Sequence, residues 1–311
     1  MRIKDKGRIV DDFFVVGHPG MPVYLLDGPT PVLFDAGIAP LAPLYVREIK
    51  EILGDRPPAL LFLTHSHFDH VGAAGFFKAA WPELKIAASP LTGKVIAKPT
   101  AVSLITKLNE ETAGAIRNWG QKDIWDVPFK PFLLDEPLSP GQKIELGPEL
   151  TVIAIPTPGH TRDFVSYYVP QKNILVASEA VGCEQNGYIM TEFLTDFDLY
   201  RESLERLAGL ETDVLCQGHH LVFTGPDAPA HIRASLVQAG RFVEMVQAFL
   251  LEQNGDLDQV VRQVKALEWD SRPWPKQAEP AYLLNTQARV KTLWARMQTL
   301  GRHRIPAVRA G

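Results

Sequence analysis

The sequence predicts an α/β protein in which a strand-rich body is followed by a helical extension. Short apolar runs alternate with helical patterns through the first two-thirds of the chain, and the last third is helical throughout. Hydrophobic residues make up 46% of the 311 residues and charged residues 22%, which suits a globular protein with a sizeable core. We place the body at 1–225 and the helical extension at 226–311.

The body is expected to consist of short strands separated by glycine, proline and helical stretches. In chain order, the expected strands are 9–16, 23–26, 32–34, 59–63, 85–88, 132–134, 143–146, 150–155, 164–169, 173–177 and, as the last one, 214–216. The expected helices are 42–53, 72–80 and 196–210, the last with Asp196 or Asp198 as its cap.

A helical insertion at about 91–125 interrupts this body, and long insertions of this kind often lie over a functional site. The extension contains three amphipathic patterns between 231 and 300. The second pattern begins at Asp256, which together with Gln259 is spaced like a capping box. His231, on the first pattern, is expected to be a solvated or capping residue.

Composition excludes several classes of protein. The net charge is −4, which does not suggest a basic nucleic-acid-binding surface. No apolar run is long enough for a membrane span, and the charged first residues lack the features of a secretion signal. Cys183 and Cys216 are too few for a disulfide framework. We therefore expect a cytoplasmic protein.

The most informative segment follows the apolar strand 59–63, where His65, His67, Asp69 and His70 fall within six residues. Neutral imidazole and carboxylate are preferred ligands of first-row metals. The two histidines that are two residues apart point the same way as the strand ends, whereas Asp69 and His70 lie where the chain turns into a helix. A single metal would use three of these groups, and distant partners would allow a second metal.

Distant partners follow three further strands. His160 comes after strand 150–155 in a Pro-Gly-His sequence, and Glu179 comes after strand 173–177. His219 and His220 both follow strand 214–216, and we favour His219 as the ligand. Strand-end loops of a layered α/β body gather along one edge, so these side chains are expected to converge. For Glu179, a supporting or surface role stays an alternative.

The ordered motifs HSHFDH, PGH, a strand that ends in an acidic residue, and GH resemble the metallo-β-lactamase superfamily over residues 7–225. The early Phe-Asp-Ala-Gly turn at 34–37 resembles a turn of the same family, in which Asp35 is expected to support the turn or a ligand. The helical extension is similar to the glyoxalase II, quinolone-signal response thioesterase and lactamase-like ribonuclease branches, most of all the thioesterases.

The resemblance implies an αββα sandwich with two divalent metal ions at one edge. It implies that the first ion is bound by His65, His67 and His160, that the second is bound by Asp69, His70 and His219, and that residue 179 bridges them. Zinc is the favoured metal, with iron and manganese as alternatives.

The sequence departs from the family at two neighbouring positions. Glu179 stands where the family has aspartate, and Ser178 stands where it has glycine. The extra methylene moves the carboxylate by roughly an ångström, against a metal–ligand tolerance of ~0.2 Å, which would weaken the second metal site or widen the pair.

The implied function is a metal-dependent hydrolase that uses a metal-bridging hydroxide on an ester or thioester of a small-molecule substrate. Asp69 would be catalytic, orienting the hydroxide and accepting its proton. A thioester is favoured because a thiol of pKa ~8.5 leaves without a dedicated acid, and His220 is the nearest candidate acid.

Two alternatives remain open. One is a phosphodiesterase or ribonuclease on the same scaffold, which would need a basic groove, although we expect neither nucleic acid nor membrane as a partner. The other is a catalytically weak sensor or interaction protein whose second site is impaired by Glu179. The C-terminal helices are the expected surface for a partner or a homodimer.

Overall fold

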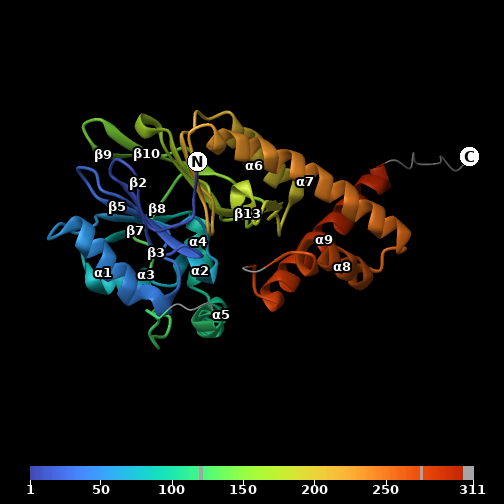
Figure 1. Ribbon diagram of the computed structural model, residues 1–311, viewed down its shortest axis with the longest axis horizontal. Coiled ribbons are helices and arrows are strands. Elements are labelled where there is room, and N and C mark those ends of the chain that lie inside the picture. Colours follow the sequence, from blue (N-terminus) through green and yellow to red (C-terminus); the bar gives the residue numbers. More distant parts are fainter. Residues whose placement is uncertain (119–121, 274–275, 304–311) are drawn as a thin grey trace, which may run out of the picture.

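The protein has four layers, in which two seven-stranded sheets pack face to face and helices cover both outer faces (Figure 1). The computed structural model describes residues 1–118, 122–273 and 276–303. An apolar core fills the space between the sheets, with Phe34 and Phe62 from one sheet against Tyr167 from the other. The expected αββα sandwich with C-terminal helices is confirmed.

The first sheet is built in chain order, because each strand pairs with the next one along the chain. Its strands are β2 (Gly7–Val10), β3 (Phe13–His18), β4 (Met21–Leu26), β5 (Val32–Phe34), β6 (Leu60–Phe62), β7 (Lys85–Ala88) and β8 (Glu136–Pro137). The helices that cover it are α1 (Ala42–Leu53), α2 (Phe68–Val71) and α3 (Ala74–Ala80), with a short turn η1 (Ala39–Leu41) before α1. Their apolar faces bury the outer face of the sheet.

The second sheet includes the N-terminal strand as one edge. From that edge its strands are β1 (Arg2–Ile3), β16 (Val222–Thr224), β15 (Val214–Cys216), β12 (Ile174–Val176), β11 (Val165–Val169), β10 (Leu150–Pro156) and β9 (Lys143–Gly147). Between β12 and α6 lie the short helical turn η3 (Ser178–Val181) and a separate hairpin of β13 (Cys183–Gln185) and β14 (Tyr188–Met190). A further turn, η2 (Pro170–Lys172), joins β11 to β12.

The C-terminal helices bury the outer face of the second sheet. The helices on this face are α6 (Phe197–Ala208) and α7 (Asp227–Glu252). Beyond the sheet, α8 (Leu257–Lys265), with a π-helical turn at Ala266–Asp270, and α9 (Glu279–His303) pack against α7 and against each other (Figure 1). Asp196 and Asp256 cap α6 and α8, because each side chain accepts a hydrogen bond from the first turn of its helix. The boundary at 225 stays a prediction, since body and extension share one apolar core.

The insertion forms α4 (Pro90–Ile96) and α5 (Pro99–Asn118). Residues 119–121 lie outside the described residues, and 122–125 are not helical, so the expected helix to 125 is wrong there. The Trp125 amide donates instead to the Pro40 carbonyl. On α5, Asn109 is buried and its Oδ1 accepts a hydrogen bond from the Ala39 amide at 2.7 Å, which holds the insertion against the loop after β5.

Four other elements differ from expectation in bounds, number or pairing. Residues 9–16 form two strands, because Asp11 takes a positive φ and turns the chain between β2 and β3. The expected helix at 72–80 begins two residues later, as α3, because the amides of Gly72 and Ala73 donate to the carbonyls of Gly37 and Ala36, and the separate α2 ends just before it. Residues 132–134 are not paired in the sheet, and the ladder forms instead at β8. The last strand is β16, which pairs with β15, and its three residues are too few to form a recognisable pattern in the sequence.

Five strands end at one edge of the sandwich. In the first sheet β5 and β6 are parallel, and in the second sheet β10, β12 and β15 run in one direction, since β11 is antiparallel to both of its neighbours. The loops that follow these five strands carry all the predicted ligands. Among the described residues, no helix is long and apolar enough to cross a membrane.

Candidate metal centre

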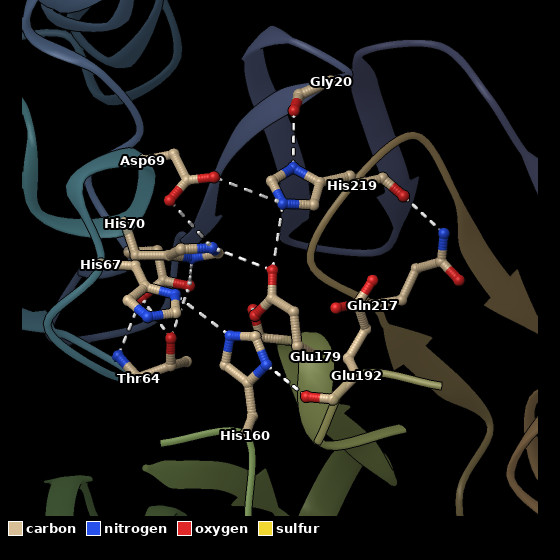
Figure 2. A network of polar contacts seen from close by, with 12 residues as sticks. Gly20, Thr64, His67, Asp69, His70, His160, Glu179, Glu192, Gln217 and His219 are labelled. Atoms are coloured by element: carbon tan, nitrogen blue, oxygen red, sulfur yellow. Dashed lines mark hydrogen bonds and ion pairs between the residues drawn. The ribbon is translucent and has the colours of Figure 1, made fainter. Parts of the chain in front are cut away.

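The seven predicted ligand side chains meet at this edge, although they come from four loops of two sheets (Figure 2). Their ligand atoms form three overlapping sets, and within each set the atoms lie within 4.8 Å of one another. The sets are His65, His67 and His160; Asp69, His70 and His219; and His65, His70 and Glu179. The geometry therefore holds two groups with Glu179 between them.

The three-histidine group (His65, His67 and His160) is compact. Nδ1 of His67 lies 3.1 Å from Nε2 of His160, and the ring of His65 lies 4.5 Å from the ring of His67. His65 is fully buried and stacks on Phe164. The β6 strand end delivers the first two rings and the Pro-Gly turn after β10 delivers the third.

The carboxylate-rich group (Asp69, His70 and His219) lies on the other side of Glu179. Oε1 of Glu179 is 3.0 Å from Nε2 of both His70 and His219. Asp69 is 3.6 Å from Nε2 of His219 and 3.9 Å from Nε2 of His70. The other oxygen of Glu179 faces His65 at 4.0 Å, so this carboxylate lies between the two groups.

In every histidine of the two groups except His67, the Nδ1 atom has a hydrogen-bond partner outside the centre. Nδ1 of His160 donates to the Glu192 carbonyl, and Nδ1 of His219 donates to the Gly20 carbonyl. Nδ1 of His70 donates to Asp35. Nδ1 of His65 contacts the Thr64 hydroxyl at 3.0 Å. Such outer hydrogen bonds fix the ring tautomer and leave Nε2 free to bind a metal ion.

The donor set fits a divalent cation by a further observation. Nε2 of His65 is buried and has no hydrogen-bond partner among the described residues, although it faces the centre. A buried polar atom without a partner is costly, and a cation at this point would satisfy it. Five imidazoles and two carboxylates around the same space are a suitable environment for zinc, iron or manganese.

Burial and neighbouring charges shift the histidine pKa values of the two groups in opposite directions. Burial lowers the pKa of His65 and His67 and brings that of His160 to about 4, so these rings are neutral near pH 7. Burial also opposes the charge of His70 and His219, but the neighbouring carboxylates, foremost Glu179, raise the pKa of both. The same imidazoles hold the pKa of Glu179 well below its usual range, against the effect of its burial.

Hydrogen bonds between the sheets hold the ligand loops in place. The hydroxyl of Tyr167, on the second sheet, donates to the Leu63 carbonyl before His65. The hydroxyl of Tyr24, on the first sheet, donates to the Gln217 carbonyl before His219. Both tyrosines are buried, so each ligand loop is fixed by the opposite sheet.

Two buried acidic residues, Asp35 and Glu192, lie beside the ligand groups. Asp35 accepts hydrogen bonds from the Thr64 amide, the Thr64 hydroxyl and His70, which agrees with the expected supporting role. Glu192 was missed by sequence reasoning, because it follows a short hairpin that the sequence did not reveal. Its carboxyl group points toward Glu179 in Figure 2, and burial raises its pKa to about 7.

Two other histidines differ from expectation. Burial lowers the pKa of His220 to about 3, so this ring is neutral near pH 7 and lacks the second ring proton that a general acid would donate. The expectation that His231 is solvated or capping is wrong, since it is buried, stacks on Phe223 and donates from Nε2 to the Val181 carbonyl. An apolar helix pattern does not show whether a lone histidine on it has a buried carbonyl to bind.

Comparison with known proteins agrees with the motifs. A model of the metallo-beta-lactamase superfamily matches residues 21–219. The chain belongs to the metallo-beta-lactamase superfamily. By family, the protein is a metallo-hydrolase.

Relatives and solved structures resemble this superfamily member over most of its length. The probable metallo-hydrolase YflN of Bacillus subtilis is 27% identical over 229 residues, which are 62% of this chain and 76% of that protein. A metallo-beta-lactamase family protein from Thermus thermophilus has a TM-score of 0.62 at 17% identity, covering 92% of this chain and 93% of the other. An archaeal superfamily protein from Sulfolobus tokodaii has a TM-score of 0.57 at 18% identity, covering 89% and 93%. These structures show a shared fold.

Proposed function

We propose that this metallo-hydrolase cleaves ester or thioester bonds of small molecules, as glyoxalase II and related thioesterases do, with two divalent cations in the described centre. The observation that carries the proposal is the convergence of inward-facing imidazole nitrogens, among them the unpaired buried Nε2 of His65, around two carboxylates. Zinc is the favoured cation, and iron and manganese suit the same ligands.

The residues divide into two ligand sets with one shared member. His65, His67 and His160 would hold one cation, and the carboxylate-rich group would hold the second. Glu179 would contact both, since its two oxygens face the two groups. Bound divalent cations lower the pKa of water toward ~7 and polarise a substrate carbonyl oxygen.

Asp69 is the residue we assign to proton transfer. Its carboxylate lies at the partly open side of the centre, with 16% of the side chain exposed, and its oxygens face His70 and His219. Ionised carboxylates accept hydrogen bonds, so Asp69 can orient an attacking water molecule and take up its proton.

The class of bond follows from the leaving group. A thiolate departs without protonation near neutral pH because its conjugate acid has a pKa of ~8.5, so a thioester places the fewest demands on the site. Glu192 supplies a buried carboxyl group beside the centre, which keeps esters within the proposed range.

The test is a substrate panel with protein loaded with zinc, iron(II) or manganese(II). We expect turnover of acyl-coenzyme A or acyl-glutathione above that of a lactone, and little cleavage of a phosphodiester. Asp69→Asn is the control, because it should lose turnover while the three-histidine group, which does not include Asp69, retains its metal. Cleavage of phosphodiesters alone would support a nuclease, and a fully loaded protein without turnover would support a sensor.

A further inference from the structure

Ser178 combines backbone strain with a contact to the shared carboxylate. It is buried at 1% exposure, its φ is +49°, and its hydroxyl donates to Oε2 of Glu179 at 2.7 Å. Five of the seven described non-glycine residues with positive φ are aspartate or asparagine, which adopt this conformation readily. Serine is not favoured there, and such backbone strain clusters at functional sites.

Gly218 provides the second half of the arrangement. A Cβ atom at this position would lie 2.1 Å from Oε1 of Glu179 and 2.6 Å from its Cδ, which no real side chain tolerates. The φ of Gly218 is not in the left-handed region, so its backbone conformation does not require glycine. The missing side chain therefore serves to make room for the longer glutamate.

The backbone beside Glu179 is held from the other side by α7. The Ser235 hydroxyl and His231 both donate to the Val181 carbonyl at the end of η3. The main chain of this turn is thus fixed, while the terminal torsion of a glutamate is broad and weakly preferred. The orientation of the carboxylate then depends on its own hydrogen bonds.

We propose that Ser178 is a positioning residue for cation binding: its hydroxyl, with the space over Gly218, orients Glu179 so that its two oxygens face the two ligand groups. This inference rests on the proposed metal centre. The strained backbone at Ser178 lowers local stability, but it places the hydroxyl where it orients the Glu179 carboxylate. The longer glutamate can then bind both cations, although the sequence alone suggested an impaired second site.

The test compares Ser178→Gly with the wild type. Glycine relieves the strain and removes the hydroxyl, so the metal-free variant should unfold at an equal or higher temperature. The weaker of two zinc-binding events, measured by competition with a chromophoric chelator, should weaken on the order of tenfold, as expected for the loss of a hydrogen bond to a charged group. A residue with only a structural role would not give these opposite signs.

Two variants provide controls. Ser178→Ala keeps the strain and loses the hydroxyl, so zinc binding should weaken without any gain in stability. Asp11→Gly relieves a positive φ in the turn between β2 and β3, and it should leave zinc binding unchanged. Wild-type zinc affinity in both Ser178 variants would overturn the proposal.

A pair of variants tests the space over Gly218. Gly218→Ala should weaken zinc binding, because its methyl group displaces the carboxylate. Gly218→Ala combined with Glu179→Asp should regain zinc binding, since the shorter side chain leaves room for the added methyl group. No recovery in the double variant would contradict this part of the proposal.

Glu179→Ala separates this inference from the proposed function. If it retains wild-type zinc stoichiometry and affinity, the metal centre as proposed is wrong. If it loses one zinc equivalent while Ser178→Gly loses nothing, only the role of Ser178 is wrong.

Discussion

The two ligand groups differ in how readily their histidines are protonated, and therefore in how readily they can bind a cation. In the three-histidine group, burial keeps the imidazoles neutral, and the pKa of His160 is about 4. In the carboxylate-rich group, the carboxylates around His70 and His219 raise the pKa of both rings. A cation entering the first group displaces no proton, whereas one entering the second competes with protons. We therefore expect the three-histidine group to bind a divalent cation more tightly near pH 7 than the carboxylate-rich group does.

The largest expected effect comes from removing one ligand of each group. His160→Ala deletes a third of a set that has no carboxylate of its own, so one ion should be lost and turnover should fall by more than ~100-fold, above the range for outer-sphere changes. His219→Ala leaves Asp69, His70 and Glu179 at the second group. Elemental analysis should show a smaller loss of metal in His219→Ala. Equal losses would remove the distinction between the groups.

The next effect concerns Asp35, which supports only the carboxylate-rich group. Asp35→Asn weakens the hydrogen bond from His70 and the contacts to Thr64, and the affinity for the second cation should fall ~10–100-fold. Asp163→Asn is the matched control, because Asp163 is also buried at this edge but accepts a hydrogen bond from Thr92 of the insertion. Chelator competition should separate the two variants.

Changing the pH sharpens the comparison without mutation. The raised pKa values of His70 and His219 mean that these rings hold protons to higher pH, and each competing proton weakens binding by up to about tenfold per pH unit below that pKa. The three-histidine group, in which burial lowers the pKa of each ring, should bind its ion with little change over the same range. Zinc titrations at pH 7.5 and 6 should show loss of the weaker event alone. A parallel decline of both events would contradict the assignment.

The contrast between the groups could be predicted from sequence only in part. The tight spacing from His65 to His70, followed by ligands after three later strands, placed all seven side chains at one edge, because parallel strand ends share an edge. The charge state of each ring could not be predicted, since it depends on burial and on the neighbouring carboxylates, foremost Glu179, which long-range folding brings together.

The strands show the same limit. Apolar runs such as β5 and β15 were predicted with their observed bounds, because a fully buried strand is apolar throughout. The two-residue strands β1 and β8, and the β13–β14 hairpin, carry too few residues for a periodic pattern and depend on their partners. Glu192 follows that hairpin, which is why the sequence did not reveal it.

The smallest effect tests whether the helical extension supports the three-histidine group. Arg289 on α9 is fully buried, pairs with Glu268 at 2.8 Å and donates to the Thr191 carbonyl at 3.1 Å. The next residue, Glu192, provides the carbonyl that His160 binds. Replacing both members of a buried pair avoids leaving an uncompensated charge, so Arg289→Met with Glu268→Gln should fold. The stronger zinc affinity should then fall by less than ~tenfold, because the contact reaches His160 only through the backbone.

Arg296→Met is the control for this last variant. Arg296 also ties α9 to the body, through two hydrogen bonds to Asp198 at the start of α6, but it touches neither Thr191 nor Glu192. It should lose some stability and retain the stronger zinc affinity. If both variants bind zinc as the wild type does, burial alone orients His160, and the helical extension contributes only to the core. If only the Arg289 variant binds zinc more weakly, the geometry of the three-histidine group depends on α9, a helix near the C-terminal end of the chain.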